Sequence, residues 1–417
     1  MLMNSGNDKI MIGYDLANAC SQISYSYISE SANVSTVASV AGEENFDIPT
    51  VLCKRCGVNQ WLFGKDALRF CEDNPEQGIL IDNLLELALA GETVQLEGKG
   101  YEPEALLTLF VKRSLGLLAG ITSLDKVQAL MFTCEELTPR MVEVLNIVSD
   151  GLGLKATDIR YQNYQESYYS YMLYQSPELW MYSSVLFDYR GDSLKVFLLE
   201  NNKNTIPVVV YINKEEKVFD GTDLELLEIS KEVFGEERVS SVYLIGERFA
   251  GGWMVESLKY LCDGRRVFQG NNLYSKGACF SQQERIQSSV AGKKHVFLGN
   301  DKLKANVGMK VLKRGEDAYF ALLDAGIAWF EIDYECEIYL QDESMLELVV
   351  TPLIHSTVKN IEIPLEGLGL KEGDITRIYM HFTLLNENVL CVEIEDLGFG
   401  CFRAPSENRW KREITLY

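Results

Sequence analysis

The sequence lacks the signatures of several large protein classes. It contains no GxSxG, no GxxxxGK followed by Ser or Thr, and no GxGxxG between a predicted strand and a predicted helix. These patterns belong to α/β-hydrolases, P-loop NTPases and Rossmann domains, respectively. No apolar run approaches the roughly 18 residues that span a bilayer. The first residues also lack the basic flank and apolar core of a signal peptide. We therefore expect none of these classes.

Positive charge is scarce. Lys and Arg total 39 against 61 Asp and Glu, which gives a formal net charge of -22, and the acidic residues are spread along the chain. A field of this sign repels phosphate backbones and anionic lipids. The sequence therefore predicts a protein that binds neither nucleic acid nor a membrane surface.

The cysteines are few and, apart from one pair, widely spaced. The 10 cysteines are scattered, without the short spacing of a disulfide-rich scaffold, so we expect a reducing, cytoplasmic compartment. Cys53 and Cys56 form a CxxC pair, but no second CxxC follows. Because a structural zinc site needs four ligands, the pair predicts ordinary thiols.

The chain has enough apolar sequence for more than one domain. Its 417 residues, 47% of them hydrophobic, exceed one ordinary domain of about 100–200 residues. Predicted strands and helices alternate up to about residue 282, which is typical of an α/β protein. From residue 296 onward apolar and polar residues alternate with period two, which predicts an all-β domain.

Two segments of the α/β region share one pattern. Residues 10–27 form an apolar strand that ends at Asp15, a small polar turn and an alternating second strand. Residues 185–200 repeat this pattern, with Asp188 at the strand end and a glycine in the turn. Both segments predict β-hairpins. The α/β region thus has the motif order of an internal duplication.

Each hairpin is followed later by a strand, a loop and a helix. In residues 126–154, Thr138 is placed to cap the helix. In residues 240–261, a strand meets a glycine-containing loop, and the following helix is expected to place Met254, Leu258 and Leu261 on one face. These units extend the duplication beyond the hairpins.

Tyrosines are concentrated in residues 161–184. Tyr161, Tyr164, Tyr168 and Tyr171 have helical spacing, which predicts one packed helix face. The alternative is an aromatic recognition surface, since tyrosine is enriched in binding hot spots.

The order of these pieces resembles the actin-like ATPase superfamily, and in particular the nucleotide-binding and β-sandwich domains of DnaK-type heat-shock chaperones. IGYDLANACSQISY (12–25) resembles the first phosphate loop of that family, and LFDYRGDSLKVFL (186–198) the second. YLIGERFAGGW (243–253) resembles the adenosine loop and NLYSKGACFS (272–281) the last small-residue helix. Residues 359–396 are similar to central strands of the peptide-binding sandwich. The resemblance covers nearly the whole chain and lies in order and spacing.

This resemblance implies an actin-like, ribonuclease H-like α/β fold of two lobes with a reduced second lobe, followed by an all-β sandwich. The implied domains are residues 1–175 for the first lobe, 176–284 for the second lobe, 285–298 for a linker and 299–417 for the β-sandwich.

The resemblance also implies a site for ATP and Mg. Asp15 and Asp188 match the family's acidic positions and would hold Mg, and Glu166 matches its catalytic glutamate. Small turn residues suit such a site because backbone N–H groups must approach phosphate oxygens closely. The implied nucleotide-binding residues are Ala17, Asn18, Ala19, Arg190, Gly191, Gly246 and Gly251. Ala17 replaces a family glycine, which requires a negative φ.

The sequence departs from the family pattern at this site. Where the chaperones have a run of glycines, this chain has Tyr189 and Arg190, two bulky side chains in the space of a phosphate. The lysine expected near residues 80–90 is absent, and loss of one catalytic charge costs about 10²–10³ in rate. The segment from Asp188 to Gly246 is also too short for the subdomain that walls the adenine cleft of the chaperones.

Three functions remain open. The favoured hypothesis is a degenerate, chaperone-like nucleotide-binding fold with little or no ATP hydrolysis, acting as a scaffold for a protein or peptide partner. The second is a divergent Mg-ATPase in which Arg190 replaces the missing lysine. The third is a peptide-binding module in residues 299–417. A fold by itself does not decide among them.

Overall fold

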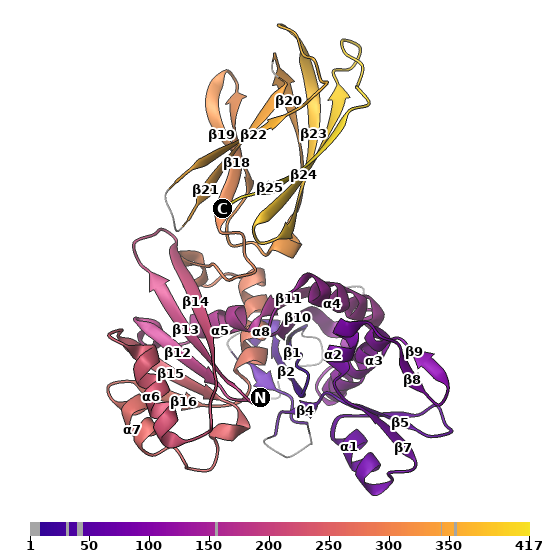
Figure 1. The fold of residues 1–417 in the computed structure, drawn as a ribbon, viewed down its shortest axis with the longest axis vertical. Coiled ribbons are helices and arrows are strands. Elements are labelled where there is room, and N and C mark those ends of the chain that lie inside the picture. The colour runs from indigo at the N-terminus through magenta and orange to yellow at the C-terminus, as the bar shows by residue number, and fades with distance from the viewer. Residues whose placement is uncertain (1–8, 31–32, 40–44, 155–156, 343, 354–356) are drawn as a thin grey trace. The chain divides into compact units, whose positions relative to one another are not determined.

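The computed structural model describes residues 9–30, 33–39, 45–154, 157–342, 344–353 and 357–417 (Figure 1). The chain forms two compact units, Met1–Val296 and Phe297–Tyr417. Residues 1–8, where the sequence predicts no signal peptide, lie outside the described residues. Within the described ranges, no helix is both long and apolar enough to cross a membrane.

The first unit contains two sheets with the same strand order. The first sheet runs β11-β10-β1-β2-β3, and β4 pairs with β2. β1 is parallel to β10, and β10 to β11, whereas β2 is antiparallel to β1 and β3. The predicted first hairpin, β1 with β2, is confirmed. The bounds are β1 (Ile10–Asp15), β2 (Cys20–Tyr27), β3 (Ser35–Thr36), β4 (Ile48–Pro49), β10 (Val127–Cys134) and β11 (Asp158–Asn163).

The second sheet runs β16-β15-β12-β13-β14 and continues to β17. β12 is parallel to β15, and β15 to β16, whereas β13 is antiparallel to β12 and β14. The predicted second hairpin is therefore confirmed, and the order and directions of the first sheet are repeated. The bounds are β12 (Ser183–Asp188), β13 (Leu194–Asn202), β14 (Val208–Lys217), β15 (Val239–Ile245), β16 (Arg266–Gln269) and β17 (His295–Phe297).

Two helices, α5 (Tyr164–Leu173) and α8 (Leu273–Ile286), lie between these sheets (Figure 1). Glycines allow the close contacts of α8. A Cβ on Gly277 would lie 1.9 Å from the Ser167 carbonyl oxygen of α5. A Cβ on Gly13 of β1 would lie 2.1 Å from the Ser275 carbonyl oxygen of α8. Only a residue without a side chain permits such a backbone approach.

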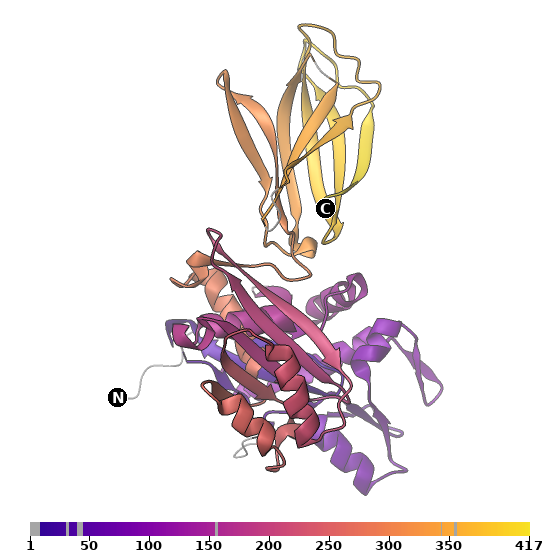
Figure 2. The ribbon, with the colours of Figure 1, turned by 60° about the vertical axis from the view of Figure 1, so that its left-hand side comes forward.

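The remaining large helices of this unit flank the sheets. α2 (Leu84–Ala90), α3 (Pro103–Leu115) and α4 (Pro139–Leu152) pack together, and α6 (Asp223–Phe234) and α7 (Glu256–Cys262) cover one face of the second sheet (Figure 2). Thr138 caps α4 as predicted, because its hydroxyl accepts a hydrogen bond from the Met141 N–H at 3.2 Å. The prediction of one packed face is wrong for Leu258, which is exposed, and for Met254, since this residue precedes α7. It is nevertheless buried in the core beneath that helix.

A small separate sheet in the first unit, of order β6-β5-β7, packs on α1. Its elements are β5 (Leu52–Arg55), β6 (Trp61–Phe63), α1 (Gly64–Asp73) and β7 (Gly78–Ile81), and a hairpin of β8 (Val94–Leu96) and β9 (Lys99–Tyr101) follows. The 3-10 helices cover residues 28–30, 116–120, 124–126, 177–180, 247–249, 292–294 and 329–331.

The second unit is all-β, as its alternating sequence predicts. Its sheets run β19-β18-β21-β22 and β20-β23-β24-β25, and side chains of both, such as Leu348 and Phe382, form one core. The strand that begins at Met345 ends at Pro352, and residues 354–356 lie outside the described residues. The bounds are β18 (Ala305–Lys313), β19 (Glu316–Leu323), β20 (Asp333–Gln341), β21 (Met345–Pro352), β22 (Lys359–Pro364), β23 (Ile375–Asn386), β24 (Val389–Gly398) and β25 (Arg409–Thr415).

The segment 285–298, expected as a linker, has regular structure at both ends. α8 continues to Ile286, and β17 (His295–Phe297) joins the second sheet beside β14. The division between the units falls after Val296. The expected linker is therefore largely part of the first unit.

Candidate functional site

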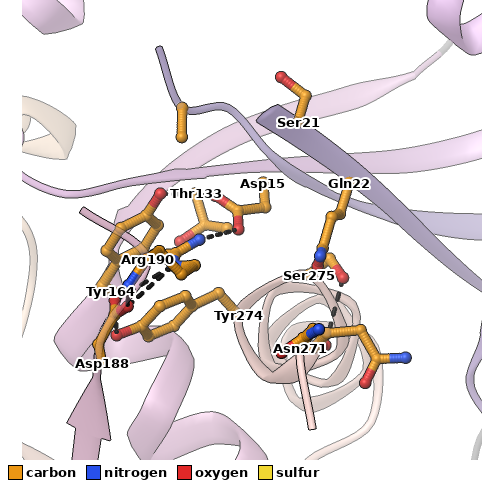
Figure 3. Close-up of polar contacts among 12 residues, drawn as sticks. Asp15, Ser21, Gln22, Thr133, Tyr164, Asp188, Arg190, Asn271, Tyr274 and Ser275 are labelled. Atoms are coloured by element: carbon orange, nitrogen blue, oxygen red, sulfur yellow. Dashed lines mark hydrogen bonds and ion pairs between the residues drawn. The ribbon is translucent and has the colours of Figure 1, made fainter. Parts of the chain in front are cut away.

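The ends of the two hairpin strands meet around one arginine (Figure 3). Asp15 is the last residue of β1 and Asp188 the last of β12, and they are only 1% and 3% exposed. Arg190 ion-pairs with both: its Nη1 lies 3.0 Å from Asp15 Oδ2, and its Nη2 lies 3.0 Å from Asp188 Oδ2. We call Asp15, Asp188, Arg190, Tyr164 and Tyr274 the arginine cluster.

The position of Arg190 follows from its place two residues after Asp188. Asp188 Oδ1 accepts hydrogen bonds from the Arg190 backbone N–H at 3.2 Å and from its Nε at 3.0 Å. An aspartate that bonds the backbone two residues ahead forms a local turn. This turn directs the guanidinium back across the strand ends, where it reaches Asp15.

Two tyrosines complete the cluster. The Tyr164 hydroxyl donates to Asp15 Oδ1 at 2.7 Å, and the Tyr274 hydroxyl donates to Asp188 Oδ2 at 3.1 Å. Their rings stack with centroids 4.0 Å apart. The Arg190 guanidinium carbon lies 4.8 and 4.7 Å from the two ring centroids, within the range of cation–π attraction. α5 supplies Tyr164 and α8 supplies Tyr274.

The charges of the cluster are unevenly balanced, with two carboxylates against one guanidinium. Burial raises the pKa of Asp15 to about 6, although the Arg190 charge and the Tyr164 hydrogen bond lower it. Burial by itself lowers the pKa of Arg190, but the Asp188 and Asp15 carboxylates outweigh this and hold it well above the usual arginine value. Arg190 therefore stays charged and satisfies both acids.

The turn of the first hairpin, residues 17–19, forms hydrogen bonds with neighbouring segments. The Ala17 carbonyl accepts a hydrogen bond from the Thr50 hydroxyl at 2.8 Å, and the Ala19 carbonyl accepts one from the Thr50 N–H at 3.0 Å. The Asn18 amide donates to Asn83 Oδ1 at 2.8 Å, just before α2. Ala17 is not among the residues with positive φ, as the sequence requires of an alanine at this position.

The segment that resembles the second phosphate loop packs against the segment that resembles the adenosine loop. Gly246 has a φ of 118°, and a Cβ there would lie 2.4 Å from the Tyr189 carbonyl oxygen. The glycine thus lets the end of β15 approach the backbone after β12. The Tyr189 ring packs on Phe249 at 5.8 Å. Gly191 and Gly251 have no atom within 4 Å of the position of a Cβ. No close contact therefore requires a glycine at either position.

Glu166 lies on a different surface. It lines a hollow of about 340 Å³ together with Ser281, Glu284 and Arg285. The carboxylates of the arginine cluster are not among the residues that line this hollow. The structure therefore brings together Asp15, Asp188 and Arg190, and places Glu166 elsewhere.

The cluster does not fit the implied Mg. Magnesium needs carboxylate oxygens that are open to the ion, but here the oxygens of Asp15 and Asp188 accept hydrogen bonds from Arg190 and two tyrosines. Among the described residues, no group of three or more His, Cys, Asp or Glu side chains is placed to hold a metal. The guanidinium occupies the position between the acids that a cation would take.

Further contacts join the two sheets outside the cluster. Glu135, which follows β10, ion-pairs with Lys195 of β13 at 2.6 Å and with Lys214 of β14 at 2.9 Å. The Tyr168 hydroxyl of α5 hydrogen-bonds to the Ser184 hydroxyl of β12 at 2.8 Å. The two halves of the first unit are thus joined by buried and half-buried polar contacts.

Sequence reasoning missed the role of Tyr164 and Tyr274. Tyr164 was expected on a packed helix face, and α5 does bury Tyr164 and Tyr168. Tyr161, expected on the same face, lies instead on β11. The only local signal for Tyr164 is its place after Asn163, whose side chain caps α5. Nothing local in the sequence indicates that Tyr274 reaches Asp188.

Comparison with known families divides the chain near residue 300. A family model described as "Family of unknown function (DUF5716) C-terminal" matches residues 33–300. A second, described as "Domain of unknown function (DUF8552)", matches residues 302–416. No curated protein matches the chain.

Proposed function

The chain belongs to the DUF5716 family of unknown function, and we propose that it is a non-catalytic protein-interaction scaffold on an actin-like fold whose former nucleotide site is closed. The observation that carries this proposal is the double ion pair of Arg190 with Asp15 and Asp188. A buried cation that satisfies both acids removes the metal ligands that phosphoryl transfer needs.

The strand order supports the fold part of the proposal. Both sheets of the first unit have the same order and the same pattern of parallel and antiparallel neighbours. α5 and α8 lie between them, and the acids of the two hairpins converge there. A duplicated sheet with a central acid pair is the arrangement that the resemblance implies for an actin-like ATPase.

The contacts between the two halves support the loss of turnover. Energy-coupled two-lobed proteins open and close about a hinge. Here Arg190 joins the two hairpin ends, and Glu135 joins the first half to Lys195 and Lys214 of the second. Each of these contacts resists relative movement of the halves.

The surface at one end of α6 and α7 supports the partner part of the proposal. Leu224 and Val255 are apolar yet 67% and 52% exposed. Asp223 accepts hydrogen bonds from the N–H groups of Glu256 and Ser257 at 2.8 and 2.9 Å, which holds the starts of the two helices side by side. We propose the starts of these two helices as the surface that binds a partner.

Thermal unfolding with Mg-ATP tests the closed site. A divergent ATPase would gain about 2.7 kcal/mol of stability at a hundredfold excess of ligand over Kd. We expect no change in Tm at millimolar Mg-ATP and no Mg-dependent release of phosphate. Stabilisation or turnover that Asp15→Ala abolishes would overturn the proposal in favour of the divergent Mg-ATPase.

Two further parts of the proposal rest on the sequence. Peptide binding by residues 299–417 stays a prediction, and binding of labelled extended peptides to the full chain is its measurement. We also propose a cytoplasmic location, which is supported by the free thiols of all ten cysteines.

A further inference from the structure

Two cysteines of the small sheet are in direct contact. Cys53 lies on β5 and Cys71 on α1, 18 positions later, and the Cys71 thiol donates a hydrogen bond to Cys53 Sγ at 3.0 Å. Both are free thiols. A disulfide has an S–S length of about 2.0 Å, so a movement of about 1 Å separates this contact from a bond.

The surroundings hold the two sulfurs together. Gly78 at the start of β7 faces the pair, and a Cβ at this position would lie 2.9 Å from Cys53 Sγ and 3.1 Å from Cys71 Sγ. The same Cβ would lie 3.1 Å from the Phe70 ring. Any larger residue at position 78 would push the thiols apart. The absence of a side chain there therefore leaves the space that the pair fills.

The core of this sheet is small. The buried residues of the cluster between this sheet and α1 are Val51, Cys53 and Ala67, with partly buried neighbours that include Phe70 and Cys71. A small core buries too little apolar surface to be stable by itself, and natural proteins often strengthen such cores with covalent links. A bond between β5 and α1 would cross the centre of this core.

We propose that Cys53 and Cys71 form a reversible intramolecular disulfide, by exchange with a low-molecular-weight disulfide, and that this bond fastens α1 to the β6-β5-β7 sheet. Cytoplasmic disulfides of this kind are usually transient and redox-sensing. Neither the closed site nor the partner surface depends on this pair.

The disulfide forms in two exchange steps, and the burial of the two cysteines determines which of them reacts first. Cys53 is fully buried, and burial, followed by the hydrogen bond to Cys71, raises its pKa to about 12. The thiolate is the attacking species, so the partly exposed Cys71 reacts first. Its thiolate attacks the external disulfide, forms a mixed disulfide and releases one external thiolate. Cys53 Sγ then attacks the Cys71 sulfur as its proton passes to the second departing thiolate.

The electrons balance in this sequence. The two protein thiols lose two electrons and become one disulfide, and the external disulfide gains them and becomes two thiols. Excess external thiol reverses both steps. Closure of the 18-residue separation restricts the unfolded chain, so the oxidised form of the sheet and α1 is the more stable one.

Redox titration of the full chain with reduced and oxidised glutathione tests the proposal. After trapping of free thiols, peptide mass spectrometry is expected to find a Cys53–Cys71 cross-link that increases with the oxidised fraction and disappears on reduction. Cys56→Ser is the matched control, because Cys56 is exposed and directly follows β5; it keeps the cross-link. Cys71→Ser loses it and leaves Cys53 reduced.

Hydrogen exchange of the unmodified sequence gives a second measurement that needs no variant. Amides of β5, β7 and α1 are expected to exchange more slowly in the oxidised protein than in the reduced one, with β18 and β21 unchanged. Two results would overturn the proposal. One is a stable glutathione adduct on Cys71 without the cross-link, and the other is oxidation of the exposed cysteines while Cys53 stays reduced.

Discussion

At the scale of single residues, Arg190 determines the contacts of the two strand-end acids. It follows Asp188 by two positions and bonds it locally, and it reaches Asp15 across 175 positions of sequence. A buried carboxylate without a partner is strongly unfavourable. One side chain therefore stabilises the two strand ends and removes the acids from other chemistry.

Removal of this side chain leaves two buried acids facing each other. We expect Arg190→Ala to lower the free energy of unfolding by about 3 kcal/mol, which is the lower end of the range for breaking a buried pair, because the guanidinium is 26% exposed. Urea denaturation at pH 7 measures this loss. Arg248→Ala is the control, since its partner Asp192 is fully exposed, and it is expected to leave the urea midpoint nearly unchanged. Equal losses in the two variants would contradict the role of Arg190.

The raised pKa of Asp15 makes a pH-dependent prediction. Its pKa is about 6 in the folded chain against 3.8 for an ordinary aspartate. Between these values the folded state binds the proton more tightly, so the contribution of Asp15 to stability is present at low pH and is lost as pH rises through about 6. We expect the stability difference between the natural chain and Asp15→Asn to fall from pH 4 to pH 7. Urea denaturation across this range measures it, and a constant difference would show that Asp15 titrates normally.

At the scale of elements, the crossing of α5 and α8 holds the cluster in place. α5 presents Tyr164 and α8 presents Tyr274, and the two rings stack at 4.0 Å. This requires the helix backbones to approach at Gly277 and Ser167. The geometry of the site is thus set by helix packing as much as by its charged groups.

Insertion of a single methyl group tests that crossing. The Cβ of Gly277→Ala would lie 1.9 Å from the Ser167 carbonyl oxygen, so the helices must separate. Overpacking of this kind costs about 1–3 kcal/mol. Gly116→Ala is the control, because its φ is -60° and no atom lies within 4 Å of its Cβ. Urea denaturation compares them, and an unchanged midpoint for Gly277→Ala would show that the helices do not cross at this point.

Sequence patterns predicted some elements and missed others for identifiable reasons. The two hairpins were predicted because an apolar strand, a small turn and an alternating strand are local signals. Thr138 was found as a cap because capping is also local. The small β6-β5-β7 sheet was missed because three short strands give little periodicity.

At the scale of the whole molecule, the chain has a large negative charge. Two exposed apolar side chains, Leu224 and Val255, lie at one end of α6 and α7. The net charge of -22 keeps such a protein soluble. Leu224 and Val255 are exposed there, as several other apolar side chains are elsewhere in the described chain. The arginine cluster and this surface are the two observations on which the proposed interaction role rests.

A charged substitution on this surface tests the partner part of the proposal. Leu224→Asp is expected to leave Tm unchanged, because the side chain is 67% exposed, and to remove protein cross-links formed in cells from the α6 and α7 surface. Cross-linking with mass spectrometry measures this. Leu312→Asp is the control, since Leu312 is 75% exposed on β18 of the other unit. If Leu224→Asp and Leu312→Asp give the same cross-links from the α6 and α7 surface, this surface binds no partner.

The sequence alone determined the charge, the two hairpins with an acid at each strand end, and the all-β second unit, because these depend on composition and on neighbours a few residues apart. The tertiary structure decided what the acids do. Arg190 has a long side chain that pairs with whichever carboxylate lies within reach, and Asp15 comes within reach only when the two sheets assemble around α5 and α8. A contact between residues so distant in sequence leaves no local pattern, and for that reason the arginine cluster became visible only in the folded chain.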